Sequence, residues 1–186
     1  MVKQLVKGEK VVINKIDDYS NNLTLKLIYE NKSETAFAID LFVFIINENN
    51  KINKKDIVYY NNPENSAKSI RLIEAYEGLE NEKKCEVDLN NIPKSISKLV
   101  LGCSVYKAEG RSTKISPVNI EFKVSNTTTN TELFNFSIEI DITSSEAVVI
   151  GEIYKHNEFW KFNATQAVSG SVLLNLIKTI YNVNLI

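Results

Sequence analysis

Few side chains in this sequence could support acid–base, nucleophilic or metal chemistry, because it contains one histidine and two cysteines. His156 lies in a polar run between two strand-like segments, which predicts an exposed turn residue. A Ser–His–Asp triad would need a nucleophile on a sharp turn, and no such motif occurs. Structural zinc would need about four Cys, His or carboxylate ligands, and there is no Cys-x-x-Cys. We therefore expect that the chain is not an enzyme.

The two cysteines, Cys85 and Cys103, each lie in an apolar or strand-like run. Cysteine is among the residues most often buried, so we predict two reduced thiols in the core. A disulfide between neighbouring strands is the alternative that the sequence leaves open. Phosphate binding by a glycine-rich loop has little support, because the chain has six glycines and neither a P-loop nor a Gly-x-Gly-x-x-Gly motif.

Length and charge limit the function further. The 186 residues fit one domain, 1–186. The net charge of −1 and the pI of about 6.0 give no global electrostatic case for nucleic acid or an anionic membrane, so we expect no nucleic-acid partner. These totals do not address a local basic patch. No apolar run is long enough for a transmembrane segment, and residues 1–15 lack the apolar core of a secretion signal, which predicts a cytoplasmic protein.

The sequence predicts that many short strands, separated by polar turns, position any functional site. Val118, Ile120, Phe122 and Val124 alternate with polar residues, as one face of a strand does. Residues 147–154 and 159–164 flank a short polar turn, which is typical of a hairpin. Further strands are expected at 23–28, 35–46, 57–60, 69–75, 84–89, 99–106 and 133–140. In a regular strand at 57–60, one of Tyr59 and Tyr60 must point outward.

Two helical segments are expected among the strands. Residues 92–96 contain an early proline and predict a short helical turn. Apolar residues from Val172 to Ile180 recur at helical spacing, and Ser169 is a plausible N-cap. We expect this C-terminal helix to close one end of a sandwich.

Several segments, in order along the chain, resemble the TerD family of bacterial stress and tellurium-resistance proteins. The strongest is the run from Gly151 to Ala164, Gly-Glu-Ile-Tyr-Lys-His-Asn-Glu-Phe-Trp-Lys-Phe-Asn-Ala, which is similar to the family's Gly-Glu-Leu-Tyr-Arg, a short turn, then Trp-Lys-Phe and Ala. The other matching segments are 5–10, 23–30, 37–41, 58–62, 87–93 and 105–108. The resemblance implies an all-β, two-sheet antiparallel β-sandwich with a short C-terminal helix. It also implies a non-enzymatic protein, since family members are associated with chemical stress, phage or colicin defence, and calcium binding.

The resemblance also implies where calcium would bind, and the sequence departs from the family there. The family's Asp-x-Asp pair reads Ala38-Ile39-Asp40, so one carboxylate remains. The family's acidic, glycine-rich loop reads as residues 74–82, with four glutamates and one glycine. Calcium takes about six to eight oxygen ligands, so several carboxylates must converge. In one interpretation Asp40, Glu77, Glu80 and Glu82 still form a weakened calcium site; in the other, the loop is a solvated acidic segment and calcium binding is lost.

The favoured hypothesis is therefore a binding or scaffold module in a stress response, with degenerate calcium sites and other stress-system proteins as partners. The alternative is a functional calcium-binding stress protein with a site built from Asp40 and the acidic loop 74–82. If calcium is lost, an inward-facing Asp40 needs a cationic or hydrogen-bonding partner, such as Arg71 or a nearby lysine. Sandwich edges also predict a homo-oligomer formed by pairing of edge strands.

Overall fold

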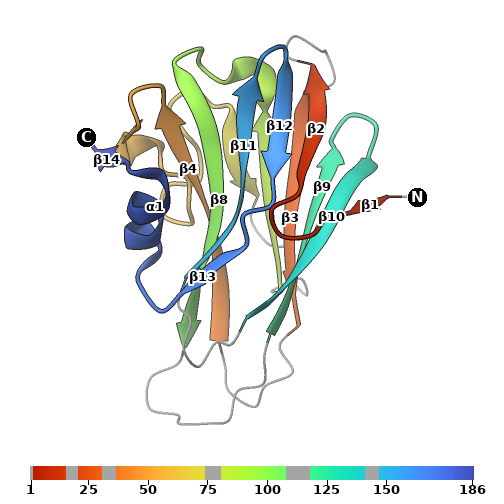
Figure 1. The fold of residues 1–186 in the computed structure, drawn as a ribbon, viewed down its shortest axis with the longest axis vertical. Coiled ribbons are helices and arrows are strands. Elements are labelled where there is room, and N and C mark those ends of the chain that lie inside the picture. Colours follow the sequence, from red (N-terminus) through yellow and green to blue (C-terminus); the bar gives the residue numbers. More distant parts are fainter. Residues whose placement is uncertain (1, 16–20, 31–36, 74–80, 108–117, 141–146) are drawn as a thin grey trace.

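The computed structural model describes residues 2–15, 21–30, 37–73, 81–107, 118–140 and 147–186, and it confirms the predicted β-sandwich (Figure 1). Within these ranges, sheet A has six strands in the order β1-β10-β9-β3-β7-β6. Sheet B has eight strands, of which seven follow the order β14-β5-β4-β8-β11-β12-β2 and β13 pairs with β11.

The strands of sheet A are β1 (Lys3–Gln4), β3 (Asn22–Tyr29), β6 (Ile70–Ile73), β7 (Glu82–Asp88), β9 (Val118–Asn126) and β10 (Thr131–Ile140). The strands of sheet B are β2 (Lys10–Lys15), β4 (Phe37–Asn47), β5 (Lys51–Ile52), β8 (Ile96–Lys107), β11 (Ala147–His156), β12 (Phe159–Asn163), β13 (Ala167–Ser169) and β14 (Asn184–Leu185). Neighbouring strands run antiparallel, except that β1 pairs with β10 and β14 with β5 in parallel.

The alternation of apolar and polar residues determines which side chains enter the core. In β9, Val118, Ile120, Phe122 and Val124 are buried between the sheets, and the residues between them are more exposed, as predicted. β10 alternates only in part because its register with β9 shifts between Glu132 and Phe134. A shift of one residue in the pairing changes which face each side chain occupies.

Aromatic rings join the two sheets. Phe162 of β12, in sheet B, lies 6.1 Å from Phe122, 4.9 Å from Phe134 and 5.5 Å from Phe136 between ring centroids, and these three residues belong to sheet A. All four rings are buried. Ring pairs at these separations add stabilisation beyond their buried area. The predicted hairpin of β11 and β12 thus carries a central part of the core.

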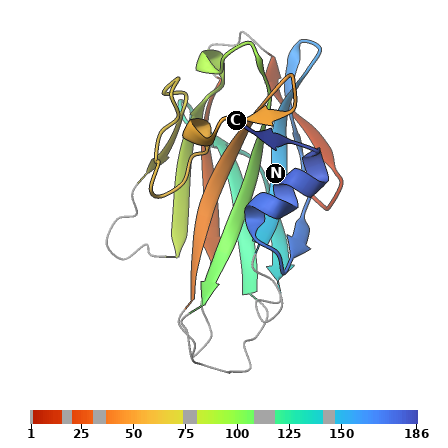
Figure 2. The same cartoon turned by 90° about the vertical axis from the view of Figure 1, so that its left-hand side faces the viewer.

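The C-terminal helix α1 (Leu173–Tyr181) lies on the outer face of sheet B and does not close the end of the sandwich (Figures 1 and 2). Leu173 and Ile177 pack there against Phe44 and Val100, because β4 and β8 are apolar on both faces. The predicted N-cap is wrong: Ser169 ends β13, and its Oγ accepts a hydrogen bond from the backbone N–H of Ser171.

Two other segments differ from the sequence expectation. Residues 57–60 form isolated bridges and no strand, because Tyr59 and Asn62 exchange backbone hydrogen bonds of 3.1 and 2.9 Å and reverse the chain. The expected helical turn at 92–96 is wrong: the N–H of Ile96 donates to the carbonyl of Pro93 at 3.0 Å, which makes a non-helical turn, and Ile96 begins β8. A 3₁₀ turn, η2 (Leu89–Asn91), lies just before it, where the Asp88 side chain accepts from the N–H of Asn90. A second 3₁₀ turn, η1 (Lys54–Asp56), follows β5.

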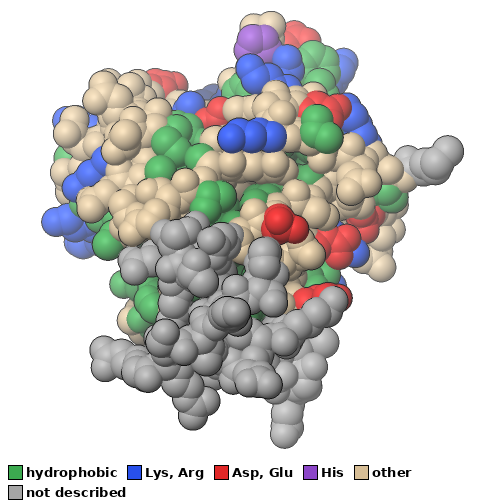
Figure 3. All heavy atoms as spheres, turned by 60° about the horizontal axis from the view of Figure 1, so that its bottom comes forward, with side chains coloured by type: hydrophobic (Ala, Val, Ile, Leu, Met, Phe, Trp, Pro, Cys, Tyr) green, Lys and Arg blue, Asp and Glu red, His purple; other side chains and the backbone are tan. Residues whose placement is uncertain are grey.

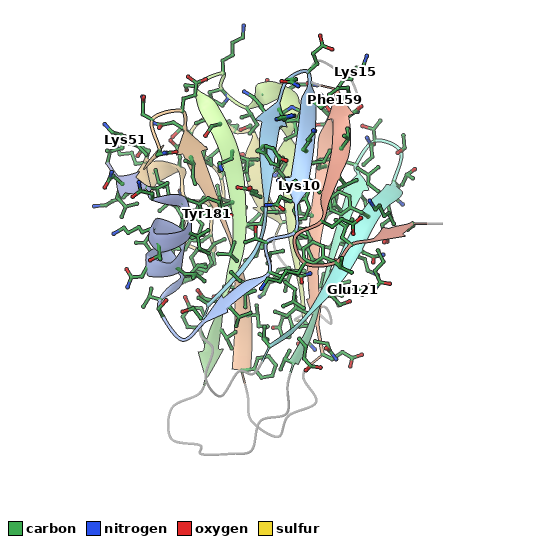
Figure 4. The ribbon with its side chains drawn as sticks, in the orientation of Figure 1. Lys10, Lys15, Lys51, Glu121, Phe159 and Tyr181 are labelled. Carbon is green, nitrogen blue, oxygen red and sulfur yellow. The ribbon has the colours of Figure 1, made fainter. Side chains whose placement is uncertain are left out.

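The edges of the sheets are partly protected. The edge strand β2 has lysines at its ends, Lys10 and Lys15 (Figure 4), and its register with β12 shifts between Trp160 and Lys161. At the edge strand β6, the N–H of Leu72 donates to the carbonyl of Pro63. Lysines and bulges discourage edge-to-edge pairing. The homo-oligomer formed through strand edges stays a prediction. No helix in the ranges that the structure covers is long and apolar enough to cross a membrane.

Gly151 provides a test of the aromatic packing. A Cβ atom at this position would collide with Cζ of Phe162 and would lie 2.6 Å from the carbonyl oxygen of Asn163. We expect Gly151→Ala to reduce the free energy of unfolding by about 1–3 kcal/mol, because the core would be overpacked. Gly102→Ala is the control: its nearest contact is the flexible end of Leu173 at 2.9 Å, so its loss should be smaller. Urea unfolding measures both, and equal losses would contradict the assigned packing.

Candidate functional site

Asp40 lies on the outer face of sheet B and not between the sheets. In β4, Ile39 and Leu41 enter the core, so Asp40 and Phe42 point the other way. Its side chain is 24% exposed, and Ser104 of β8 lies opposite it. The expectation of an inward-facing Asp40 was therefore wrong, because the period of two in the strand fixes its direction.

A lysine provides the cationic partner of Asp40. Nζ of Lys83 lies 3.9 Å from Oδ1 of Asp40, although Lys83 belongs to β7 in the other sheet. Arg71, the other residue considered, bonds Glu86 at 3.1 Å instead. An ammonium group beside the carboxylate offsets part of the charge that a metal ion would neutralise.

The structure does not bring Asp40 and Glu82 together. Glu82 bonds Lys26 of β3 at 3.1 Å, on the face of sheet A that points away from the core. Glu77 and Glu80 lie outside the described residues. Among the residues that the structure does describe, no group of three or more His, Cys, Asp or Glu side chains could hold a metal ion.

A cavity of about 180 Å³ opens beside Asp40. Its apolar lining is Leu41, Pro63, Leu72 and Ile73, and its polar lining is Asp40, Tyr60, Lys83 and Lys84. Hydrophobic side chains reach the surface at this end of the molecule, beside the grey atoms (Figure 3). The cavity thus combines an apolar wall with a carboxylate and two ammonium groups.

A larger cleft of about 420 Å³ lies over the outer face of sheet A. Its lining includes Glu86, which bonds Arg71, and Asp88, whose Oδ1 accepts from the N–H of Asn90. Asp88 Oδ2 also accepts from the side-chain amide of Asn91 at 2.7 Å. These carboxylates stabilise local structure, so the cleft is a weaker candidate than the surface around Asp40.

Two tyrosines that the sequence did not indicate as site residues lie near Asp40. Tyr106 follows Ser104 by two residues on β8 and points to the same face as Asp40. Partial burial raises the pKa of Tyr106, and the negative charge of Asp40 adds to the shift. Tyr60 lines the cavity with Asp40. The alternation of β8 could have identified Tyr106, but no local pattern indicated that Tyr60 lies in a turn.

Neither cysteine is placed for chemistry. Cys85 and Cys103 are free and fully buried, which confirms the predicted thiols. Burial raises the pKa of each thiol to about 12. His156 is exposed beside the turn at Asn157, as predicted.

The sequence matches the TerD domain family over residues 1–179. The chain belongs to this family. General stress protein 16U of Bacillus subtilis (strain 168) is 29% identical over 174 residues, covering 88% of this chain and 89% of its own. Tellurium resistance protein TerD of Serratia marcescens is 25% identical over 171 residues, covering 88% and 89%.

A solved structure supports the fold. A homologue of telluride resistance protein (TerD) from Streptomyces coelicolor A3(2) superposes with a TM-score of 0.61 at 12% identity, covering 88% of this chain and 99% of that one. At this identity the likeness shows the fold alone. Within this TerD domain, the motif residues Gly151, Trp160, Phe162 and Ala164 are all buried, so the segment that carries the family resemblance is a structural one.

The buried thiols predict a dependence of stability on pH. The unfolded chain releases its thiol protons near pH 9, whereas the folded chain holds them to about pH 12. The folded state therefore binds more protons in this window, and its stability falls as pH rises through it. Between about pH 8 and pH 10 we expect a loss of about 1.4 kcal/mol for each thiol.

Urea unfolding at these pH values measures the loss. Cys85→Ala and Cys103→Ala should each reduce the pH dependence by about half of the thiol contribution. An unchanged pH dependence in both variants would show that the thiols are not its cause.

Proposed function

We propose that this chain is a non-enzymatic TerD-family stress or tellurium-resistance protein that acts as a binding or scaffold module. In this proposal its calcium site is degenerate, and the ammonium group of Lys83 replaces a metal ion opposite Asp40. The partners would be other proteins of a cytoplasmic stress system.

The observation that carries the proposal is the 3.9 Å pair between Lys83 and Asp40. A calcium ion bound by Asp40 would have to displace this ammonium or share the site with it, and the two cations repel each other. Ala38, in place of the family's first aspartate, supplies no oxygen from its side chain. Calcium needs more oxygen ligands than Asp40 alone can give.

Other observations support a role in binding over one in catalysis. The two thiols are buried with raised pKa values, and a thiolate is the form that reacts. His156 lies at an exposed turn. The relatives carry names that refer to general stress and tellurium resistance, which favours a stress role for this chain.

Calcium titration tests the proposal. We expect no calorimetric heat and no rise in melting temperature at about 1 mM calcium, because a ligand that binds the native state must stabilise it. The same result is expected for Lys84→Gln, whose ammonium pairs with Glu86 and not with Asp40. Lys83→Gln removes only the competing cation, so any gain of weak calcium binding in this variant alone would place the lysine in the ion's position.

Tight calcium binding by the unaltered protein, lost in Asp40→Asn, would reject the proposal. It would instead support the calcium-binding stress protein built from Asp40 and the acidic loop 74–82.

A further inference from the structure

Two exposed aromatic side chains lie near Asp40. Tyr106 is its diagonal neighbour on the same face of sheet B, and Tyr60 lines the same cavity. Tyr60 is 59% exposed and Tyr106 is 48% exposed, high fractions for large aromatic side chains. Diagonal neighbours on antiparallel strands lie about 7–8 Å apart, so a flat group can lie between Tyr106 and Asp40.

Stacked rings hold Tyr60 in place. Its ring meets that of Tyr59 edge-on at 5.5 Å and 87°. Tyr59 in turn stacks on Phe42 of β4 at 5.5 Å and 5°. Phe42 stacks on the buried Phe44 at 6.1 Å. Because this series begins in the apolar layer under α1, Tyr60 is presented to solvent on a fixed support, and little side-chain entropy remains to be lost on binding.

The carboxylate of Asp40 is available to a stronger partner. Its distance of 3.9 Å from Lys83 exceeds the range of about 2.7–3.2 Å for a hydrogen bond. Asp40 therefore retains positions that can accept hydrogen bonds. A carboxylate beside aromatic faces attracts a cation through both its charge and the quadrupoles of the rings.

We propose that Asp40, Tyr60 and Tyr106 form a clamp that binds an arginine side chain of a partner protein. Guanidinium is planar, donates two parallel hydrogen bonds to one carboxylate, and stacks on aromatic rings. It is also more weakly hydrated than an ammonium group, so it enters a partly buried site more readily than lysine does. The clamp assigns a class of partner to the binding module and so rests on the proposed function.

The cavity fits the remainder of such a side chain. Leu41, Pro63 and Leu72 offer an apolar wall to the methylene stem of the arginine. Tyrosine and arginine are both enriched in protein interfaces, where they are frequent hot spots. An incoming guanidinium would displace the ammonium of Lys83 from Asp40. Stacking on the tyrosines and contact of its stem with the apolar wall, neither of which a calcium ion can make, would favour this exchange. The clamp therefore predicts opposite effects for loss of Asp40 and loss of Lys83.

The test uses labelled hexa-arginine and hexa-lysine peptides and the full chain, with binding followed by fluorescence anisotropy at low salt. Asp40→Asn should weaken hexa-arginine binding about ten- to a hundredfold. Tyr60→Ala and Tyr106→Ala should each weaken it about two- to fivefold, whereas Tyr60→Phe, which keeps the ring, should not. Lys83→Gln should strengthen it by up to about fivefold. Glu139→Gln, at an exposed position of β10, is the matched control and should have no effect.

Three results would overturn the clamp: absence of hexa-arginine binding, equal binding of hexa-lysine, or equal effects of Asp40→Asn and Glu139→Gln. A thermal melt of each variant separates loss of binding from loss of folding. The calcium titration separates the two proposals. A chain that binds neither calcium nor hexa-arginine retains the proposed function and loses only the clamp, whereas tight calcium binding at Asp40 rejects the proposed function itself.

Discussion

The structure depends on the contact of one ring, Phe162, with three rings of the opposite sheet. The ring reaches them because β12 presents it inward and because Gly151 on the neighbouring strand has no side chain in its path. Protein cores pack at the density of organic crystals, so a ring in this position fixes the spacing of the sheets. The directions of the outer side chains follow, because successive side chains of each strand point to opposite faces of the sheet.

The same constraint explains why the family resemblance predicts the fold better than the function. Gly151, Trp160 and Phe162, the core of the motif, are all buried. Glu152, which points outward, bonds Lys98 at 3.0 Å and Asn163 at 3.1 Å. Lys98 in turn lies 5.1 Å from the ring centroid of Tyr181 of α1, so this glutamate helps to position the helix. The motif therefore describes packing, and it does not identify the residues that carry function.

The sequence predicted the strands well where the alternation of apolar and polar residues was regular. β9 and the hairpin of β11 and β12 follow from alternation and turn spacing, since each strand has a core face and a more solvent-exposed face. β2 was missed because Val11, Val12 and Ile13 form a short apolar run, although Val12 is 50% exposed. The segment 57–60 has strong strand propensity, yet the hydrogen bonds of Asn62 make it a turn. Propensity is a weak indicator where a side chain competes for the backbone.

The site could be predicted only in part, because the alternation of side chains along β7 decides which of its residues pairs with Asp40. Lys83 shares a face with Cys85 and Val87, so it points toward the other sheet and reaches Asp40, whereas Glu82 and Lys84 point outward. A one-residue shift of β7 would present Glu82 or Lys84 in its place. Glu82 there would create two facing carboxylates, the arrangement that recruits a metal ion, while Lys83 creates an ion pair that does not need a metal ion. Under the proposed function, the loss of the metal site thus depends on the register of one strand, and composition alone does not reveal it.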